Sequence, residues 1–482
     1  MLNKYLAISK HFRLVSFFFL VGAICYTQST AQVLQAYNVN TMRILLDSNK
    51  SYPVDTVPQQ KRFWQAGGQL MLAQVIPWSF NKFVRKAEFA NISFNSIWHN
   101  MQFKNWRWDD NNFNTNQFAH PYHGNLYFNA FRTNGYNFWA SSAAAIGGSY
   151  IWETCGETHP AAPNDLINTS LGGIALGEMT YRLANRIINN RKKGAGRRLQ
   201  EITGFLINPM NGFTRITTGK WGKVYDADPY ENAPLAFMVD AGSRRVGLRV
   251  KDFIDRGENE WYTRLRLLYG DPFKDMNKPF SNFSVSAELG NDDSSRLNSL
   301  LVSGNLYGKR LRSASPAVKN YFSITMHYDY YKNERLNFGA QSFAANLFSN
   351  RKLGLKSELQ LSAGAGIVAL AAVPNKYVYF GEGRNYDYGP GFTYAGSAGL
   401  TVSDKLFCTA NYRGAWFKTI DGEQSNYYLH TSSFEARYAL SKYFSAGVEG
   451  GLFQLIGKYR DFDDVNDEYP FVRVFVGYRI VF

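Results

Sequence analysis

The end of the chain carries the pattern that most narrows what this sequence can fold into. Between residues 472 and 482 one set of alternate positions is wholly apolar, while the other set holds Arg473, Phe475, Gly477 and Arg479. Successive side chains of a β-strand point to opposite faces, so these residues form a strand with one apolar face and a second face that carries both arginines. Such a strand separates lipid from a polar interior, as in the wall of a membrane barrel. The apolar positions are Val472, Val474, Val476, Tyr478, Ile480 and Phe482.

The same period of two recurs from about Pro234 to the end of the chain. Most runs are about 9–14 residues long, which is the length that a tilted membrane strand needs. The sequence therefore predicts a membrane all-β fold with a helical insert, in which about 12 antiparallel strands, within a range of roughly 10–14, close a transmembrane β-barrel. The runs lie at 235–250, 261–269, 283–289, 296–308, 322–330, 336–348, 359–363, 391–402, 405–417, 426–439, 443–456 and 472–482.

Connection lengths agree with a barrel. Counted back from the chain end, tight and long connections alternate, as do the short periplasmic turns and long external loops of such barrels. The strand ending at Phe482 also resembles the C-terminal signal strand that outer-membrane barrels present to their assembly machinery, which we expect as a partner during biogenesis. The tight connections lie at 349–352, 403–405 and 441–442, and the long ones at 373–391, 418–426 and 457–470.

The N-terminus predicts export. Residues 1–31 resemble a secretory signal peptide, with basic residues before an apolar stretch at 14–24 and a small-residue cleavage site ending at Ala31. Together with the barrel, this places the protein in the outer membrane of a Gram-negative bacterium. Because an exported protein rarely meets nucleic acid, the formal charge of +15 favours outer-membrane lipids or lipopolysaccharide as partners. The mature cysteines, Cys155 and Cys408, do not form a disulfide scaffold.

Between the leader and the barrel lies a region of helical character. We expect a loose leader at residues 32–62, a helical core region with possible first strands at 63–200, and barrel strands at 201–482. Within His120–Glu178 three short apolar helices are predicted: one from Pro121 to Asn134, one from Phe138 to about Trp152, and one capped by Asn164 or Asp165. The second helix is roughly 22 Å long, which is too short for the ~30 Å of a bilayer core. These helices are therefore expected to pack on the barrel or plug it.

Polar residues within these helices are the candidate functional residues. A group of His, Glu and Asp side chains in an apolar pocket suits general acid–base chemistry, a weak metal site or, as the favoured interpretation, a structural polar network. Two histidines three residues apart, without an H-E-x-x-H motif, are a weak metal signal, so we predict neither a metal nor a cofactor. Arg132 is the expected counter-ion of Glu153. The catalytic candidates are His120, His123, Glu153, Asp165 and Glu178, and the candidates for a structural network are Arg132, Asn129 and Asn164.

Several short motifs in this region also resemble those of a known family. They are Trp108-Asp109, the run HPYHGNLYFNA from His120 to Ala130, Arg132-x-Asn134-Gly135, Trp152-Glu153, Gly156-Glu157, Asn164-Asp165-Leu166, and Gly172-Gly173 with Gly177-Glu178. The set is similar to a bacterial envelope family known as domain of unknown function 3943, over roughly residues 60 to 200. Asn111 and Ser170 depart from the family pattern, where an acid and a proline are expected. The resemblance implies an envelope protein and no particular activity.

The features together favour a transport, binding or structural role for an outer-membrane barrel, with the helical region as a plug. The alternative is an outer-membrane lipid-modifying enzyme, a hydrolase or acyl transferase, that uses the His/Glu cluster. Such an enzyme needs a serine beside a histidine, yet no G-x-S-x-G motif surrounds Ser141, Ser142 or Ser149. An enzymatic role is therefore the less favoured reading. The sequence specifies neither the ligand nor the oligomeric state.

Overall fold

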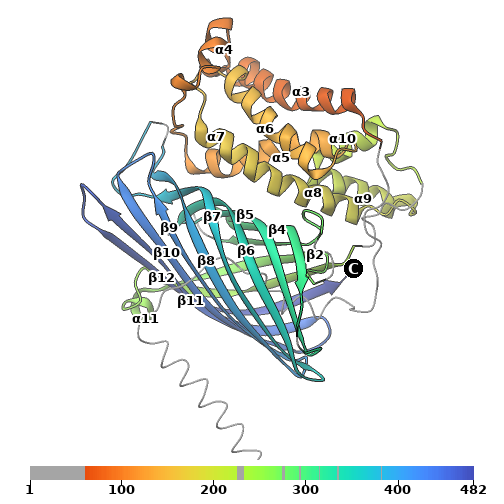
Figure 1. The fold of residues 1–482 in the computed structure, drawn as a ribbon, viewed down its shortest axis with the longest axis vertical. Coiled ribbons are helices and arrows are strands. Elements are labelled where there is room, and N and C mark those ends of the chain that lie inside the picture. The colour runs from red at the N-terminus through yellow and green to blue at the C-terminus, as the bar shows by residue number, and fades with distance from the viewer. Residues whose placement is uncertain are drawn as a thin grey trace, which may run out of the picture.

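The computed structural model describes residues 60–224, 233–273, 277–291, 295–313, 315–333, 336–381 and 383–481. It consists of a helical domain followed by a β-barrel, and the two lie side by side (Figure 1). The predicted signal peptide at 1–31, most of the predicted leader and the terminal Phe482 lie outside the described residues.

The second half of the chain forms the predicted barrel, a 12-stranded antiparallel sheet. Neighbours in sequence are neighbours in the wall, β12 pairs with β1, and β9 lies against β10, where Asn411 donates a hydrogen bond to Ser433 over 3.2 Å. The predicted strand number is therefore confirmed, and each predicted run lies within or overlaps one strand. The strands are β1 Leu235–Val246, β2 Glu258–Tyr269, β3 Phe283–Gly290, β4 Leu297–Leu311, β5 Val318–Lys332, β6 Asn337–Gly354, β7 Ser357–Pro374, β8 Tyr386–Val402, β9 Leu406–Lys418, β10 Ser425–Ala439, β11 Phe444–Tyr459 and β12 Val465–Val481. A short helix, α11 (Phe253–Arg256), lies between β1 and β2.

The two faces of the barrel wall differ as the alternation predicts. In β12, Val474 is 59 % exposed on the outside, whereas its neighbour Phe475 is 2 % exposed and lies beneath the guanidinium groups of Arg264 and Arg437. Other exposed apolar side chains on the outer face include Leu347 and Phe392. The inner face is polar because charged residues occupy the alternate positions.

Two of the long connections are shorter than expected. The pairing of β11 with β12 continues to Gly457 and Val465, which leaves residues 460–464 as the loop in place of 457–470. The connection between β7 and β8 likewise spans 375–385 in place of 373–391. In both cases residues expected in a loop continue the strand ladder, whose backbone hydrogen bonds do not depend on side-chain type.

The helical domain extends further along the chain than predicted. Its last helix ends at Thr217 and the first strand begins at Leu235, so the boundary expected at residue 200 falls within a helix. No strand forms among the described residues 63–200, where possible first strands were expected. Residues 94–100, for example, form helix α4, which Ser93 caps through its bond to the backbone of Ser96. The elements are α3 Phe63–Ser79, η1 Phe80–Arg85, η2 Glu88–Ala90, α4 Phe94–Asn100, η3 Phe103–Asn105, η4 Thr115–Ala119, α5 His120–Arg132, α6 Phe138–Cys155, α7 Pro163–Ile167, η5 Asn168–Gly172, α8 Gly173–Ile187, α9 Gly194–Ile207 and α10 Pro209–Thr217. None of the helices among the described residues is both long and apolar enough to cross a bilayer.

The limits of the central helices follow from their capping residues. The Asn137 side chain accepts the Ala140 N–H over 2.9 Å at the start of α6, which begins at Phe138 as predicted and ends at Cys155, slightly beyond the predicted Trp152. The third helix, expected to be capped by Asn164 or Asp165, starts earlier, because Pro163 occupies its first position after Ala162. It then passes through the π-helical η5 into α8. Asn164 and Asp165 are thereby free to bond outside their own helix.

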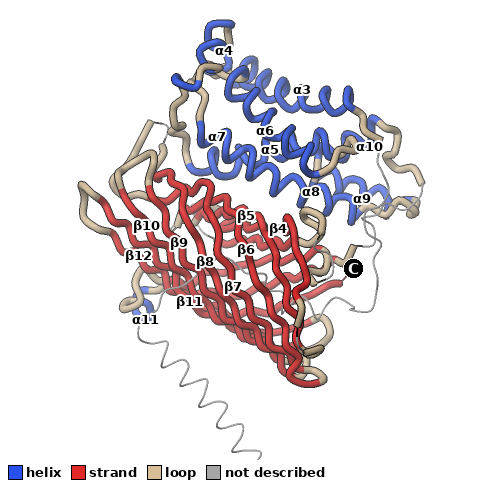
Figure 2. The backbone as a smooth tube through the Cα atoms, viewed as in Figure 1, coloured by secondary structure: helices blue, strands red, loops and turns tan. Residues whose placement is uncertain are grey.

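The helices pack on the outer side of the barrel wall. Tyr328 of β5 donates to the carbonyl of Gln117 over 2.6 Å, and Tyr386 of β8 donates to the carbonyl of Asn111 over 2.9 Å. Both tyrosines share the outward face of their strands with exposed apolar residues such as Ile324 and Phe392. Of the two expected arrangements, packing of the helices on the barrel is therefore confirmed and the plug is not, and Figure 2 shows the helical layer beside the barrel. The apolar helices pack on the outer wall because its surface is also apolar, whereas the lumen is lined by charged side chains.

Candidate functional site

Ion pairs cross the lumen of the barrel. Arg264 of β2 bonds to Glu435 of β10 over 3.1 Å and to Glu449 of β11 over 2.7 Å. Nearby, the carboxylate of Asp240 in β1 forms ion pairs with Arg266 at 2.6 Å and with Arg437 at 2.8 Å. Because β11, β12 and β1 stand between β10 and β2 in the wall, the contact between Arg264 and Glu435 spans the interior.

A second bridge crosses the lumen elsewhere. Arg413 of β9 is fully buried and bonds to Asp329 of β5 over 2.8 Å and to the Thr393 hydroxyl over 2.9 Å. A buried guanidinium needs such partners, because its transfer from water costs several kcal/mol. In each bridge, three strands of the wall separate the two partners, so that both bridges cross part of the lumen.

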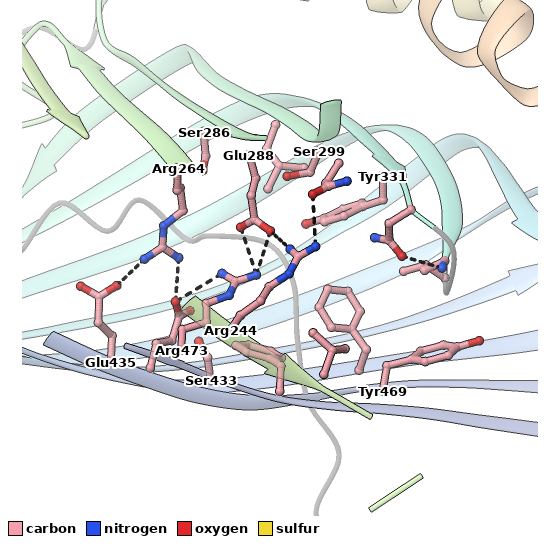
Figure 3. A pocket seen from close by; sticks show the side chains of 18 of the residues that line it. Arg244, Arg264, Ser286, Glu288, Ser299, Tyr331, Ser433, Glu435, Tyr469 and Arg473 are labelled. Carbon is pink, nitrogen blue, oxygen red and sulfur yellow. Dashed lines mark hydrogen bonds and ion pairs between the residues drawn. The ribbon is translucent and has the colours of Figure 1, made fainter. Parts of the chain in front are cut away.

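The first bridge borders a cavity of about 120 Å³. Figure 3 shows arginine and carboxylate side chains pointing toward one another across this pocket. Arg244 bonds to Glu288 and also to Glu260 over 2.6 Å, and Arg473 bonds to Glu288 over 3.0 Å. Aromatic side chains complete the lining, which includes Tyr331, Tyr469 and Phe471.

Sequence reasoning did not single out these luminal residues. The sequence feature that could have identified them is a charged residue on the less apolar face of a predicted strand, as in Asp240, Arg264, Glu288 or Glu435. That signal identifies inward-facing positions, but the pairing depends on how the sheet closes. Residues 171 positions apart, such as Arg264 and Glu435, meet only in the closed barrel.

In the helical domain, three of the predicted candidates come together. His120 at the start of α5, Glu153 near the end of α6 and Asp165 in α7 each offer a ligand atom, and these atoms all lie within 4.8 Å of one another. We call these three residues the acid–histidine cluster. Its two carboxylates are buried, and the side chain of His120 is 14 % exposed.

Hydrogen bonds hold each member of the acid–histidine cluster. Glu153 accepts the Ala162 N–H over 2.9 Å, and Asp165 accepts the Asn164 side-chain amide over 2.7 Å. Nδ1 of His120 lies 3.2 Å from the Thr169 hydroxyl, and its Nε2 lies 3.8 Å from Asp165.

Burial controls the protonation of the acid–histidine cluster. It raises the pKa of Glu153 and of Asp165 well above the ordinary values, and the neighbouring carboxylates add to the rise. Burial also lowers the pKa of His120 to about 4. The imidazole is therefore neutral at physiological pH and can donate a lone pair.

The other candidates lie outside this cluster. Glu178 of α8 bonds to Arg132 over 2.6 Å and to Arg182 over 2.8 Å, so Arg132 is not the counter-ion of Glu153 that the sequence predicted. Nε2 of His123 lies 2.9 Å from the carbonyl of Ala73 and 3.1 Å from the Tyr127 hydroxyl. Each group has partners of its own, typical of a structural network.

The two asparagines predicted for a structural network also have defined partners. Asn129 donates to the carbonyls of Asn125 and Gly177 over 3.0 and 3.1 Å, linking α5 to α8. Asn164 reaches the barrel, where its amide donates to the Tyr388 hydroxyl over 3.2 Å.

Of the three serines considered for an enzymatic role, Ser141 and Ser142 bond to the helix backbone, and the hydroxyl of Ser149 is buried with no hydrogen-bond partner among the described residues. The hydroxyl of Ser141 donates to the carbonyl of Asn137, and that of Ser142 to the carbonyl of Phe138, each over 2.9 Å. The hydroxyl beside His120 belongs instead to Thr169, which is 2 % exposed. This arrangement lends no support to an acyl-transfer site built on these serines.

The barrel is closed and antiparallel, with an apolar outer face and a charged lumen. Among the solved structures that match part of this chain are outer-membrane channels and porins. The NanC porin matches with a TM-score of 0.29 and 9 % identity, over 50 % of this chain and 98 % of that chain. An outer-membrane channel from Pseudomonas putida F1 matches with a TM-score of 0.29 and 11 % identity, over 52 % and 95 %. The channel DcaP of Acinetobacter baumannii matches with a TM-score of 0.26 and 10 % identity, over 51 % and 96 %.

The helical domain carries the family match. Residues 105–210 match the model of the family described as Domain of unknown function (DUF3943). This confirms the resemblance noted in the motifs around His120 and Glu153. No curated protein matches the chain.

Proposed function

We propose that this protein is an outer-membrane transport barrel whose lumen is closed at rest by ion pairs. The observation that carries the proposal is the bridge from Arg264 of β2 to Glu435 and Glu449 of β10 and β11, which lies across the interior and beside a cavity. A barrel with a purely structural role would be served equally well by an apolar interior, which is often more stable than buried ion pairs.

The outer surface supports a membrane location. Apolar side chains such as Val472, Val474 and Val476 are exposed on the barrel wall, where water would be a poor solvent for them. The helical domain also exposes large apolar side chains on the surface of α3 and α4, among them Trp64, Phe94 and Trp98. Exposed apolar area of this extent marks a membrane or partner surface, and the helical domain then rests beside the barrel in contact with lipid.

The luminal chemistry suits a small polar solute with charges of both signs. Arg244, Arg264 and Arg473 offer guanidinium groups to the cavity, and Glu288 and Glu435 offer carboxylates. A zwitterionic solute can replace one partner in each of two ion pairs, so that no buried charge is left unpaired while the bridge opens. An apolar solute has no such means of opening the lumen.

Conductance of the purified protein in planar lipid bilayers tests the closed lumen. We expect the wild type to conduct in rare, brief openings, and Arg264→Ser to open more often because the bridge to Glu435 and Glu449 is lost. Arg245→Ser is the matched control, since Arg245 bonds to Asn259 and to the carbonyls of Phe253 and Ile254 outside the luminal network. Steady porin-like conductance of the wild type, or equal behaviour of both variants, would contradict the proposal.

A further inference from the structure

We infer that His120, Glu153 and Asp165 form a binding site for one divalent metal ion of the zinc or manganese class. The sequence gave only a weak metal signal and no predicted metal, because the three residues lie on three different helices. The inference is independent of the proposed transport role, since the site lies in the helical domain and shares no residue with the luminal bridges.

The geometry suits a single ion. One imidazole nitrogen and two carboxylate oxygens are ligands that zinc and manganese accept. Around a tetrahedral ion with bonds of about 2.0 Å, ligand atoms lie about 3.3 Å apart. The ligand atoms of the cluster, all within 4.8 Å of one another, reach that spacing by movements of about 1 Å.

The two acids of the cluster differ from other buried acids of this domain in their partners. Elsewhere in the same domain, buried Glu178 is paired with Arg132 and Arg182, and buried Glu201 with Arg197 and Arg215. Within the described ranges, neither Glu153 nor Asp165 has a lysine or arginine at ion-pair distance. Arg384, whose charge acts on Asp165, is itself bonded to Asp421. In the described part of the chain, the two buried acids therefore have no lysine or arginine beside them, and their ligand atoms and that of His120, all within 4.8 Å of one another, surround a position that a divalent ion can take.

Hydrogen bonds around the ligands are those that a metal site needs. A metal-bound histidine usually has its other ring nitrogen bonded to a neighbour, and bound carboxylates are bonded as well. Here Thr169 lies beside Nδ1 of His120, which leaves Nε2 facing Asp165. The Ala162 N–H and the Asn164 amide hold the two carboxylates.

An ion at this position would fasten the helical domain to the barrel. It would join α5, α6 and α7 at one point, and Asn164 would connect that point to Tyr388 on the outer wall. The expected role is therefore structural, with metal binding coupled to the stability of the helical domain.

Metal content and metal uptake of the full-length protein in detergent test the inference. We expect the protein stripped with a chelator to take up one Zn²⁺ or Mn²⁺ per chain in titration calorimetry, and its thermal transition to rise on binding. Mg²⁺ at the same concentration should bind much more weakly, because it gives up its water ligands reluctantly and has little affinity for an imidazole nitrogen.

Two variants and a control make the assignment specific. Asp165→Asn and His120→Gln should each weaken Zn²⁺ uptake at least ~10-fold, while His159→Gln, a change at an exposed histidine outside the cluster, should leave it unchanged. Heat-modifiable gel migration confirms that each variant retains its barrel. No uptake by the wild type, or equal uptake by Asp165→Asn and wild type, would overturn the metal site and leave the luminal proposal standing. If Asp165→Asn misfolds, an unchanged wild-type thermal transition on adding Zn²⁺ would still overturn it.

Discussion

Arg413 of β9 bonds to Asp329 of β5 over 2.8 Å, although three strands stand between them in the barrel wall. Both side chains are buried, with exposures of 0 % and 1 %. The contact shows that side chains of the barrel itself cross the lumen. Because both partners are buried, we expect the stability of the barrel to depend on this pair.

Asp329→Ala should destabilise the barrel by about 3–5 kcal/mol, because it leaves the buried guanidinium of Arg413 without its anionic partner. The free energy of unfolding from urea titration in detergent measures the effect. Asp461→Ala, which removes an exposed partner of Arg460, should change stability little. A loss below about 1 kcal/mol for Asp329→Ala would show that water already solvates the pair.

Glu178→Gln should loosen the helical domain, because it removes the negative charge shared by Arg132 and Arg182. We expect faster proteolysis between the helices and a cost of about 3–5 kcal/mol. Limited proteolysis followed by mass spectrometry locates the cleavages. Cleavage confined to the barrel loops would contradict this role of Glu178.

The stability of the helical domain should depend on the ionisation of Glu201. Burial alone would raise the pKa of its carboxyl, but hydrogen bonds and charges from Arg215, the Gly222 N–H and Arg197 lower the pKa below its ordinary value of 4.5. A carboxyl with a lowered folded-state pKa stabilises the fold above the unfolded pKa, and this contribution is lost as the pH falls through the folded pKa.

Thermal unfolding of the wild type and Glu201→Gln should therefore differ most near pH 7. The difference should shrink below about pH 4.5, where the protonated carboxyl resembles the amide. A difference that stays constant over this range would show that the charge of Glu201 contributes nothing.

Gly124→Ala should destabilise the contact between α5 and η5. A Cβ on Gly124 would lie 1.8 Å from the backbone oxygen of Thr169, so the helices must move apart at a cost of about 1–3 kcal/mol or more. Gly147→Ala is the matched control in α6, because a Cβ there meets nothing within 4 Å. It should stabilise the helix by about 0.5–1 kcal/mol. Circular dichroism melting of both variants compares the two, and equal shifts would contradict the close packing.

The barrel could be predicted from the sequence because the pattern that indicates a strand lies within the strand itself. Each strand has one apolar and one polar face, so a period of two appears in runs such as 472–482 without knowledge of any partner strand. Helices α5 and α6 were readable for a similar reason, since Pro121, Asn137 and Gly156 act on their own backbone. The third helix was misplaced because Asn164 and Asp165, which have capping chemistry, bond instead to Tyr388 and lie against His120.

The candidate residues were identified in part. His120, Glu153 and Asp165 stood out as ionisable groups in an apolar stretch, and the structure brings these three together. Glu178 and His123 stood out equally, yet pack elsewhere with Arg132 and Tyr127. Which polar group meets which depends on helix packing, and residue type alone does not record it.

The sequence by itself determined that this chain forms a barrel of about 12 strands with a helical domain ahead of it, because strand period and helix capping are properties of neighbouring residues. Only the tertiary structure decided that the helices lie on the outer wall, that Arg264 and Arg413 bridge the lumen, and that the acid–histidine cluster forms. These features join residues far apart in the chain, and they depend on how the sheet closes and how three helices meet. Contacts between residues far apart in the chain form only on folding, and no periodic pattern in the sequence indicates them.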